Sequence, residues 1–245
     1  MPGFANNTRV GVQPLTSFYS VDTTEQMPSG TIVAGDDSWW GGGGEFMYVK
    51  AGGTITQFAL VTILPTFSSA LNRWEFVATE VPNTANLGRS VGVAMIAATS
   101  GQFIWAQIAG VTPVKTGASV AADTSFGITA AGTTGAVAAG KQILNARVVG
   151  AATTTVAKSN CVSPSGSTVL SVPNADGWFP GIYLSGTGIA AATLISSVDI
   201  SGKKVVLNNA TTAAVNGTVT GTYNNATIFY NVAVLNRPFA QGAIT

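Results

Sequence analysis

The sequence predicts an all-β protein, and three observations support this fold class. Short runs of β-branched or aromatic residues alternate with Gly, Asn, Asp or Pro, which is typical of many short strands separated by turns. No long segment keeps an apolar stripe with the 3.6-residue period of a helix. Hydrophobic residues make up 46% of the 245 residues, enough to fill a packed core. We therefore expect a β-barrel or sandwich-like main domain.

The N-terminal region differs from the rest of the chain. Residues 1–30 contain prolines and scattered polar residues without clear alternation, so we expect an extended arm that becomes ordered against a neighbouring subunit. Its apolar anchors are Phe4, Val10, Val12, Leu15, Phe18 and Tyr19. The four consecutive glycines at residues 41–44 follow and favour a loop, with Trp39 and Trp40 at its root.

The expected strands follow, each a β-branched or aromatic run that ends at turn residues. In the first part of the chain they cover residues 45–50, 54–63, 74–78, 91–98, 102–109, 111–114, 126–129 and 143–149. In the second part they cover residues 168–172, 182–184, 193–198, 203–207, 218–221 and 228–235.

A domain boundary is expected near residue 157, after a strand and a Thr-rich stretch. Residues 158–225 have the character of a self-contained small β-module, whereas the strand at 228–235 resembles those of the first part. We therefore predict a discontinuous main β-domain, 31–157 and 226–245, with the module inserted at an exposed loop.

Composition argues against several classes of function. The chain has 11 Lys and Arg against 10 Asp and Glu, a net charge of +1, so no basic surface for nucleic acid is expected. It has no histidine and one cysteine, Cys161, which argues against His-dependent catalysis, zinc sites and an internal disulfide. We expect no catalytic residue, no metal and no cofactor. The sequence also suggests neither a membrane span nor a signal peptide.

Two aromatic groups are candidates for recognition. Trp39 and Trp40 lie beside Asp36 and Asp37, which could suggest a glycosidase or carbohydrate-binding module. Adjacent residues of an extended chain point to opposite faces, however, so we favour a solvated loop with tryptophan anchors. The second group, residues 178–179, is either an exposed recognition tip or, as we prefer, an internal contact of the small module. The possible interface residues are Phe4, Phe18, Tyr19, Trp39, Trp40, Trp178 and Phe179.

Four segments of the main domain resemble the capsid decoration, or cement, proteins of tailed bacteriophages. They are residues 45–63, residues 87–114 with the pattern Trp-x-Gln-Ile-x-Gly at 105–110, residues 118–129 followed by residues 143–149, and residues 231–239. Residues 181–190 resemble small β-modules appended to many phage virion proteins. The long arm and the insertion depart from the family pattern.

The resemblance implies a non-enzymatic structural protein on the outside of an icosahedral head, where it stiffens the shell. Its partners would be the major capsid protein and further copies of itself, with a trimer as the family's common state. It would be made in the host cytoplasm and reside in the virion. The alternatives are a tail or head-fibre component and, less favoured, a carbohydrate-binding module or glycosidase that uses Trp39, Trp40, Asp36 and Asp37.

Overall fold

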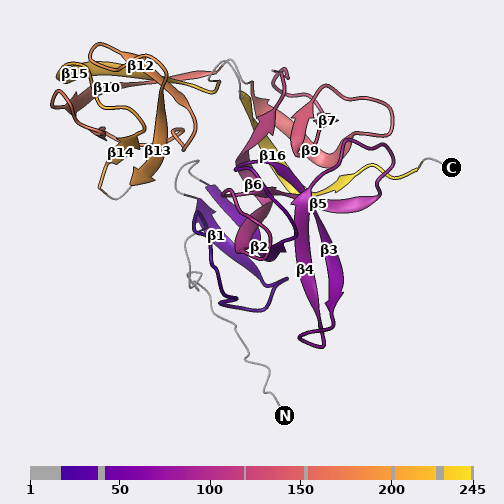
Figure 1. The fold of residues 1–245 in the computed structure, drawn as a ribbon. Helices are drawn as coiled ribbons and strands as arrows, with labels where there is room; N and C mark the ends of the chain where they lie inside the picture. Colours follow the sequence, from indigo (N-terminus) through magenta and orange to yellow (C-terminus); the bar gives the residue numbers. More distant parts are fainter. Residues whose placement is uncertain are drawn as a thin grey trace.

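The computed structural model describes residues 18–37, 42–118, 120–151, 154–199, 202–224 and 229–243, with only the backbone at 36–37 and 42–43. It confirms the expected all-β fold (Figure 1). The described strands are β1 (Ile32–Asp37), β2 (Gly42–Ala51), β3 (Leu60–Ser68), β4 (Arg73–Glu80), β5 (Arg89–Ala94), β6 (Phe103–Thr116), β7 (Gly127–Ala130), β8 (Thr133–Gly135), β9 (Ile143–Gly150), β10 (Thr155–Ser163), β11 (Val169–Ser171), β12 (Tyr183–Gly186), β13 (Thr193–Asp199), β14 (Lys204–Leu207), β15 (Val215–Thr222) and β16 (Phe229–Ala240). Across these residues no helix is long and apolar enough to cross a membrane.

The main sheet closes on itself around one small core. β2 pairs with β4, β4 with β3, β3 with β5, β5 with β6, and β6 returns to β2, so these strands form a ring. β6 continues beyond the ring and pairs with β16, which also pairs with β9. β1 extends the sheet beside β2, and the short strands β7 and β8 extend it beyond the far end of β6.

Alternation along β2 and β6 explains why the main domain has apolar packing on both faces of these strands. Tyr48 and Trp105, which are register partners, belong to one hydrophobic cluster. The next pair, Val49 and Ile104, points to the opposite face and belongs to a second cluster. Because side chains alternate with a period of two, one pair of strands serves both cores. Trp105 is fully buried.

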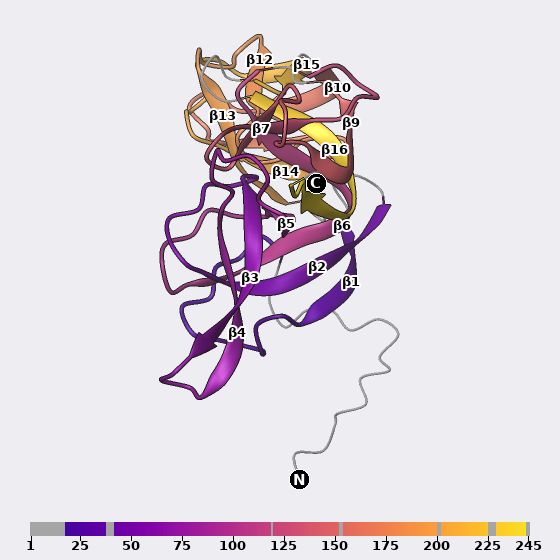
Figure 2. The same cartoon turned by 90° about the vertical axis from the view of Figure 1, so that its right-hand side faces the viewer.

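Strands β10–β15 form a second, closed barrel in the order β10-β11-β14-β13-β12-β15 (Figures 1 and 2). The sequence places the start of this module at residue 158, but residues 155–157 already pair with residues 220–222. The threonine-rich stretch therefore contributes to the first barrel strand. β16 makes its described pairings with β5, β6 and β9 of the main sheet.

Phe179 of the second barrel packs against the main domain. Its ring lies 5.4 Å from that of Phe58 and 5.4 Å from that of Tyr230, both edge-on, and 5.2 Å from that of Tyr223. Gly181 follows at a close approach, where an added Cβ would lie 2.7 Å from the Tyr230 hydroxyl. This aromatic group joins the two barrels.

Residues 18–30 correct one expectation. The sequence suggests an arm ordered by a neighbouring subunit, whereas these residues lie on the main domain of the same chain. Phe18 stacks on Phe46 with ring centroids 3.8 Å apart, and the Tyr48 hydroxyl donates a hydrogen bond to Asp22 at 2.7 Å. The reason is that the main domain itself offers Phe18 an aromatic surface. The expected contacts of residues 1–17 lie outside the described residues.

The glycine-rich segment is a second correction. Residues 42–44 do not form a loop but open β2, paired with residues 35–37 of β1. A Cβ on Gly44 would lie 2.7 Å from the Ala109 carbonyl oxygen, and one on Gly35 would lie 2.3 Å from the Phe18 ring. At Gly35 and Gly44, glycine therefore permits close packing.

Candidate protein-binding site

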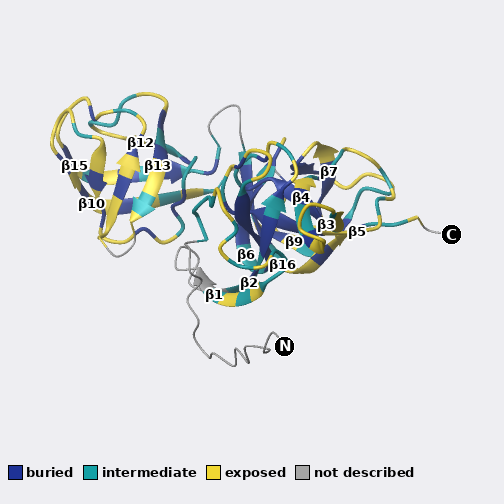
Figure 3. Cartoon of the chain, turned by 60° about the horizontal axis from the view of Figure 1, so that its bottom comes forward, coloured by how far each residue is buried: buried dark blue, intermediate teal, exposed yellow. Residues whose placement is uncertain are grey.

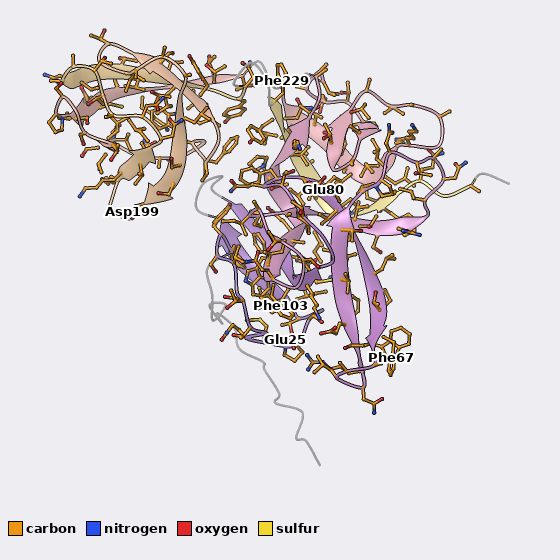
Figure 4. All side chains as sticks on the ribbon, viewed as in Figure 1. Glu25, Phe67, Glu80, Phe103, Asp199 and Phe229 are labelled. Carbon is orange, nitrogen blue, oxygen red and sulfur yellow. The ribbon has the colours of Figure 1, made fainter. Side chains whose placement is uncertain are left out.

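The β3–β4 hairpin extends beyond the rest of the main domain and exposes three apolar side chains at its end (Figures 1, 2 and 4). Phe67 is 50% exposed, Leu71 51% and Trp74 64%. Phe67 and Trp74 are direct register partners, and their rings meet edge-on with centroids 5.5 Å apart. We call these three residues the hairpin tip.

The burial pattern of the hairpin explains how the tip becomes exposed. The first four residues of β3, Leu60–Ile63, are buried in the main domain, whereas residues 65–67 are exposed. Asn72 has a φ of 49°, a left-handed conformation that asparagine tolerates in tight turns. Arg73 next to the turn forms an ion pair with Glu25. The tip is therefore a fixed hairpin end with apolar side chains in solvent.

A second exposed apolar surface lies on the outside of the small barrel. Val169 and Val206 are register partners on β11 and β14, and Val162 lies on the adjacent strand β10. All three are exposed; Val162 and Val206 lie between buried neighbours and Val169 precedes the buried Leu170, in the alternation that Figure 3 shows along the barrel strands. We call these three residues the barrel patch.

An open surface depression of about 730 Å³ lies over β6 where that strand runs between β2 and β16. It is lined largely by small residues, with an ion pair and an asparagine beside them. The lining residues are Ala34, Gly35, Gly44, Glu45, Ala109, Gly110, Asn236 and Arg237. Arg237 donates two hydrogen bonds to Glu45, at 2.9 and 3.1 Å, and these bonds lower the pKa of that carboxyl.

A cavity of about 550 Å³ with a mixed polar and apolar lining lies where β9 and β16 separate. The register of this strand pair shifts between Leu235 and Phe239, and both Asn145 and Arg237 adopt left-handed φ values, 57° and 48°. Arg147 reaches Asp123 at 2.9 Å across the cavity's edge, in an exposed ion pair. The charged groups of this cavity, Asp123 and Arg147, are both exposed, and no titratable group in its lining is buried.

Buried ionisable groups occur inside the small barrel. Lys158 donates hydrogen bonds to the Asn174 side-chain oxygen at 2.5 Å and to the Asp176 carbonyl at 2.7 Å, and burial lowers its pKa. The Cys161 thiol donates to the Lys158 carbonyl at 3.3 Å, and burial raises its pKa. A raised thiol pKa disfavours the reactive thiolate. In the described part of the chain, no group of three or more His, Cys, Asp or Glu residues could hold a metal ion.

The residues singled out from the sequence do not form one site. Trp178 and Phe179 are fully buried; the Trp178 indole donates to the Val156 carbonyl at 3.0 Å, an internal contact of the barrel. Neither side chain is therefore exposed for contact with a partner. Phe18 and Tyr19 are partly buried against the main core. Phe4, Trp39 and Trp40 lie outside the described residues, as do the side chains of Asp36 and Asp37.

The hairpin tip escaped the sequence reasoning. Trp74 is the first residue of an expected strand, and a tryptophan in a strand is usually assigned to the core. The available signal was Phe67 and Trp74 on either side of a short Ser, Ala and Asn turn, which pairs two aromatic residues at a hairpin end.

Comparison with known proteins returns no match: no family model, no curated protein and no solved structure resembles this chain significantly.

Proposed function

We propose that this protein is a structural, non-enzymatic virion component that binds the outer surface of an icosahedral phage capsid and joins adjacent capsomers. The observation that carries the proposal is the presence of two separate apolar surfaces, the hairpin tip on the main domain and the barrel patch on the second barrel. A protein that joins neighbours needs at least two contact surfaces on one rigid body. The proposal follows the interpretation, made from the sequence, that residues 45–63 and 87–114 resemble decoration proteins.

The physical basis of adhesion would be apolar burial. Only 9% of the residues are charged, so few ion pairs are available to cross an interface, and exposed ion pairs contribute ~0–1 kcal/mol each. Burial of apolar surface contributes ~25 cal/mol per Å² and is not screened by salt. Several modest contacts to one shell add through effective concentration.

Quantitative mass spectrometry of purified virions tests the proposal. A copy number in proportion to the capsomers is expected, whereas a few copies per particle would indicate a tail or fibre part, and absence from the virion would refute the proposal. Particles that lack the protein should still assemble but should rupture at a lower temperature than complete particles. Adding the purified protein back should restore their resistance to heat equally at low and at high salt.

Variants can test the barrel patch directly. Replacing Val162 and Val206 by aspartate should reduce occupancy on stripped particles, because a carboxylate would have to lose its water at the contact. The same change at Val137, an exposed valine of the main domain, is the matched control and should leave occupancy unchanged. Equal occupancy for all variants would remove the barrel patch from the contact.

A further inference from the structure

A lysine lies inside the small barrel because β10 carries an irregularity. Lys158 is only 9% exposed, and Cys161, three residues later, is fully buried. In a regular strand these two residues would lie on opposite faces. The register of β10 with β15 shifts between them, and Asn160 adopts a left-handed φ of 58°. Such a bulge redirects a side chain, and here it brings the lysine amine inward.

The Lys158 amine has neutral partners. Its Nζ donates to the side-chain oxygen of Asn174 at 2.5 Å and to the backbone carbonyl of Asp176 at 2.7 Å. Among the described residues, no carboxylate forms an ion pair with Lys158. A buried ammonium without a counter-ion is costly, and burial accordingly lowers the pKa of this amine. The neutral amine, which burial favours, has the lone pair of a nucleophile.

The Asn174 amide is placed to be attacked by that amine. Because a carbonyl bond is about 1.23 Å long, Lys158 Nζ lies no more than about 3.7 Å from Asn174 Cγ. Reacting atoms in a productive arrangement lie ~3–3.5 Å apart, so rotation of the amide about its Cβ–Cγ bond is enough to bring the carbon to the amine. Asn174 is exposed on its other side, which lets a small leaving group escape into solvent.

We propose that Lys158 and Asn174 react with each other and form an isopeptide cross-link within the small barrel. A bond forms from Lys158 Nζ to Asn174 Cγ, the bond from Cγ to the amide nitrogen breaks, and ammonia leaves with the proton that Nζ gives up. No oxidant or reductant is needed. Asp176, which is exposed and acts electrostatically on Lys158, is the carboxylate that relays this proton to the leaving nitrogen.

The cross-link would fasten β10 to the segment that precedes Trp178 and Phe179. Phe179 is the residue that packs against Phe58 and Tyr230 of the main domain. A covalent bond between residues 158 and 174 closes a loop and restricts the unfolded chain as a disulfide does. The bond lies within one chain and does not depend on the proposed function.

Intact-mass spectrometry of the denatured full-length protein tests the cross-link. Wild type should be lighter than its sequence by the mass of one ammonia molecule. Lys158→Met and Asn174→Ala should each have the full mass of their sequences, and Asn174→Ala changes only an exposed side chain, so it should fold. Lys204→Met, at an exposed lysine of the same barrel, is the matched control and should keep the mass deficit. Circular dichroism verifies that each variant is folded.

Peptide mapping locates the bond. Trypsin should fail to cut after Lys158 and should release residues 148–203 as one peptide that lacks one ammonia. A further cut after Leu170 should leave the two segments joined, whereas in Asn174→Ala they should separate. Cyclisation at Asn216-Gly217 also releases ammonia, but it leaves the peptide 148–203 unlinked. A wild type with full mass after prolonged incubation, a deficit that persists in Asn174→Ala, or a deficit outside residues 148–203 would each overturn the inference.

Discussion

Replacing Phe179 by alanine should destabilise the protein by about 4 kcal/mol and uncouple the two barrels. Phe179 is fully buried, and truncation of a buried phenylalanine costs ~3–5 kcal/mol. Its edge-on contacts with Phe58 and Tyr230 are each worth ~0.5–1.5 kcal/mol beyond area burial, so the loss should not fall at the lower end of that range. Because these contacts join the barrels, their loss should also reduce cooperativity of unfolding.

Differential scanning calorimetry and urea unfolding measure both effects. We expect one transition for wild type and two for Phe179→Ala, with the small barrel and the main domain unfolding separately. Phe67→Ala is the control, since a half-exposed side chain at the hairpin tip should cost no more than ~0.5 kcal/mol. A loss below about 1 kcal/mol with a single remaining transition would refute the assignment of Phe179 as the joining residue.

Three further predictions concern strain, pH and thiol reactivity. Gly132→Ala should lower the free energy of unfolding, measured with urea, by ~1–3 kcal/mol, because φ is +60° and the new Cβ would lie 2.8 Å from the Glu80 carboxyl carbon. Gly53→Ala is the control and should lower it much less, because a Cβ at Gly53 would meet no other atom within 4 Å. Burial raises the pKa of Tyr223 and of Tyr230 to about 12, so these tyrosines ionise at lower pH in the unfolded chain than in the folded protein. The free energy of unfolding should therefore fall between pH 10 and 12, by roughly 2 kcal/mol per tyrosine. In a Tyr230→Phe variant this fall should be shallower, and an unchanged pH dependence would contradict the prediction. Cys161 should react with a thiol reagent only as fast as the barrel opens, so labelling should accelerate with urea; rapid labelling of the native protein would show that the thiol is accessible.

Local patterns predicted the strands but not their closure. Residues 45–50 and 102–109 are runs rich in aromatic and other apolar residues bounded by turn residues, which is why each could be assigned as a strand. That β2 and β6 pair and close a ring depends on contacts between residues almost sixty positions apart, such as Tyr48 with Trp105. Pairing at this separation is decided by the assembled core, and no local signal specifies it.

The glycine-rich segment shows why local propensity misled the interpretation. Four glycines in a row predict a loop because glycine weakens a strand. In the folded chain Gly44 faces the Ala109 carbonyl, and Gly35 lies under the Phe18 ring, so the absence of a side chain is what permits the strand pairing there. Phe179 shows a related limit of local sequence signals: the preferred internal contact agrees with its burial, but its packing against the main domain was not foreseen. The sequence weighed an exposed tip against an internal contact of the small module, and no local signal pointed to Phe58 and Tyr230, which lie far from Phe179 in the sequence.

The connection between the barrels determines how a protein that joins adjacent capsomers would transmit mechanical force. The small barrel is reached from β9 and left toward β16, and these two strands are themselves paired, with Gly150 opposite Val232. At the boundary, Tyr223 donates its backbone N–H to the Thr154 carbonyl at 3.2 Å, and Tyr230 donates to the Tyr223 carbonyl at 2.8 Å. Force on the small barrel would therefore pass through two adjacent strands into the middle of the main sheet, where β16 also pairs with β6. That load would be shared by the paired strands and by the aromatic contact of the barrels, so that a surface on each barrel would be mechanically connected through the main sheet.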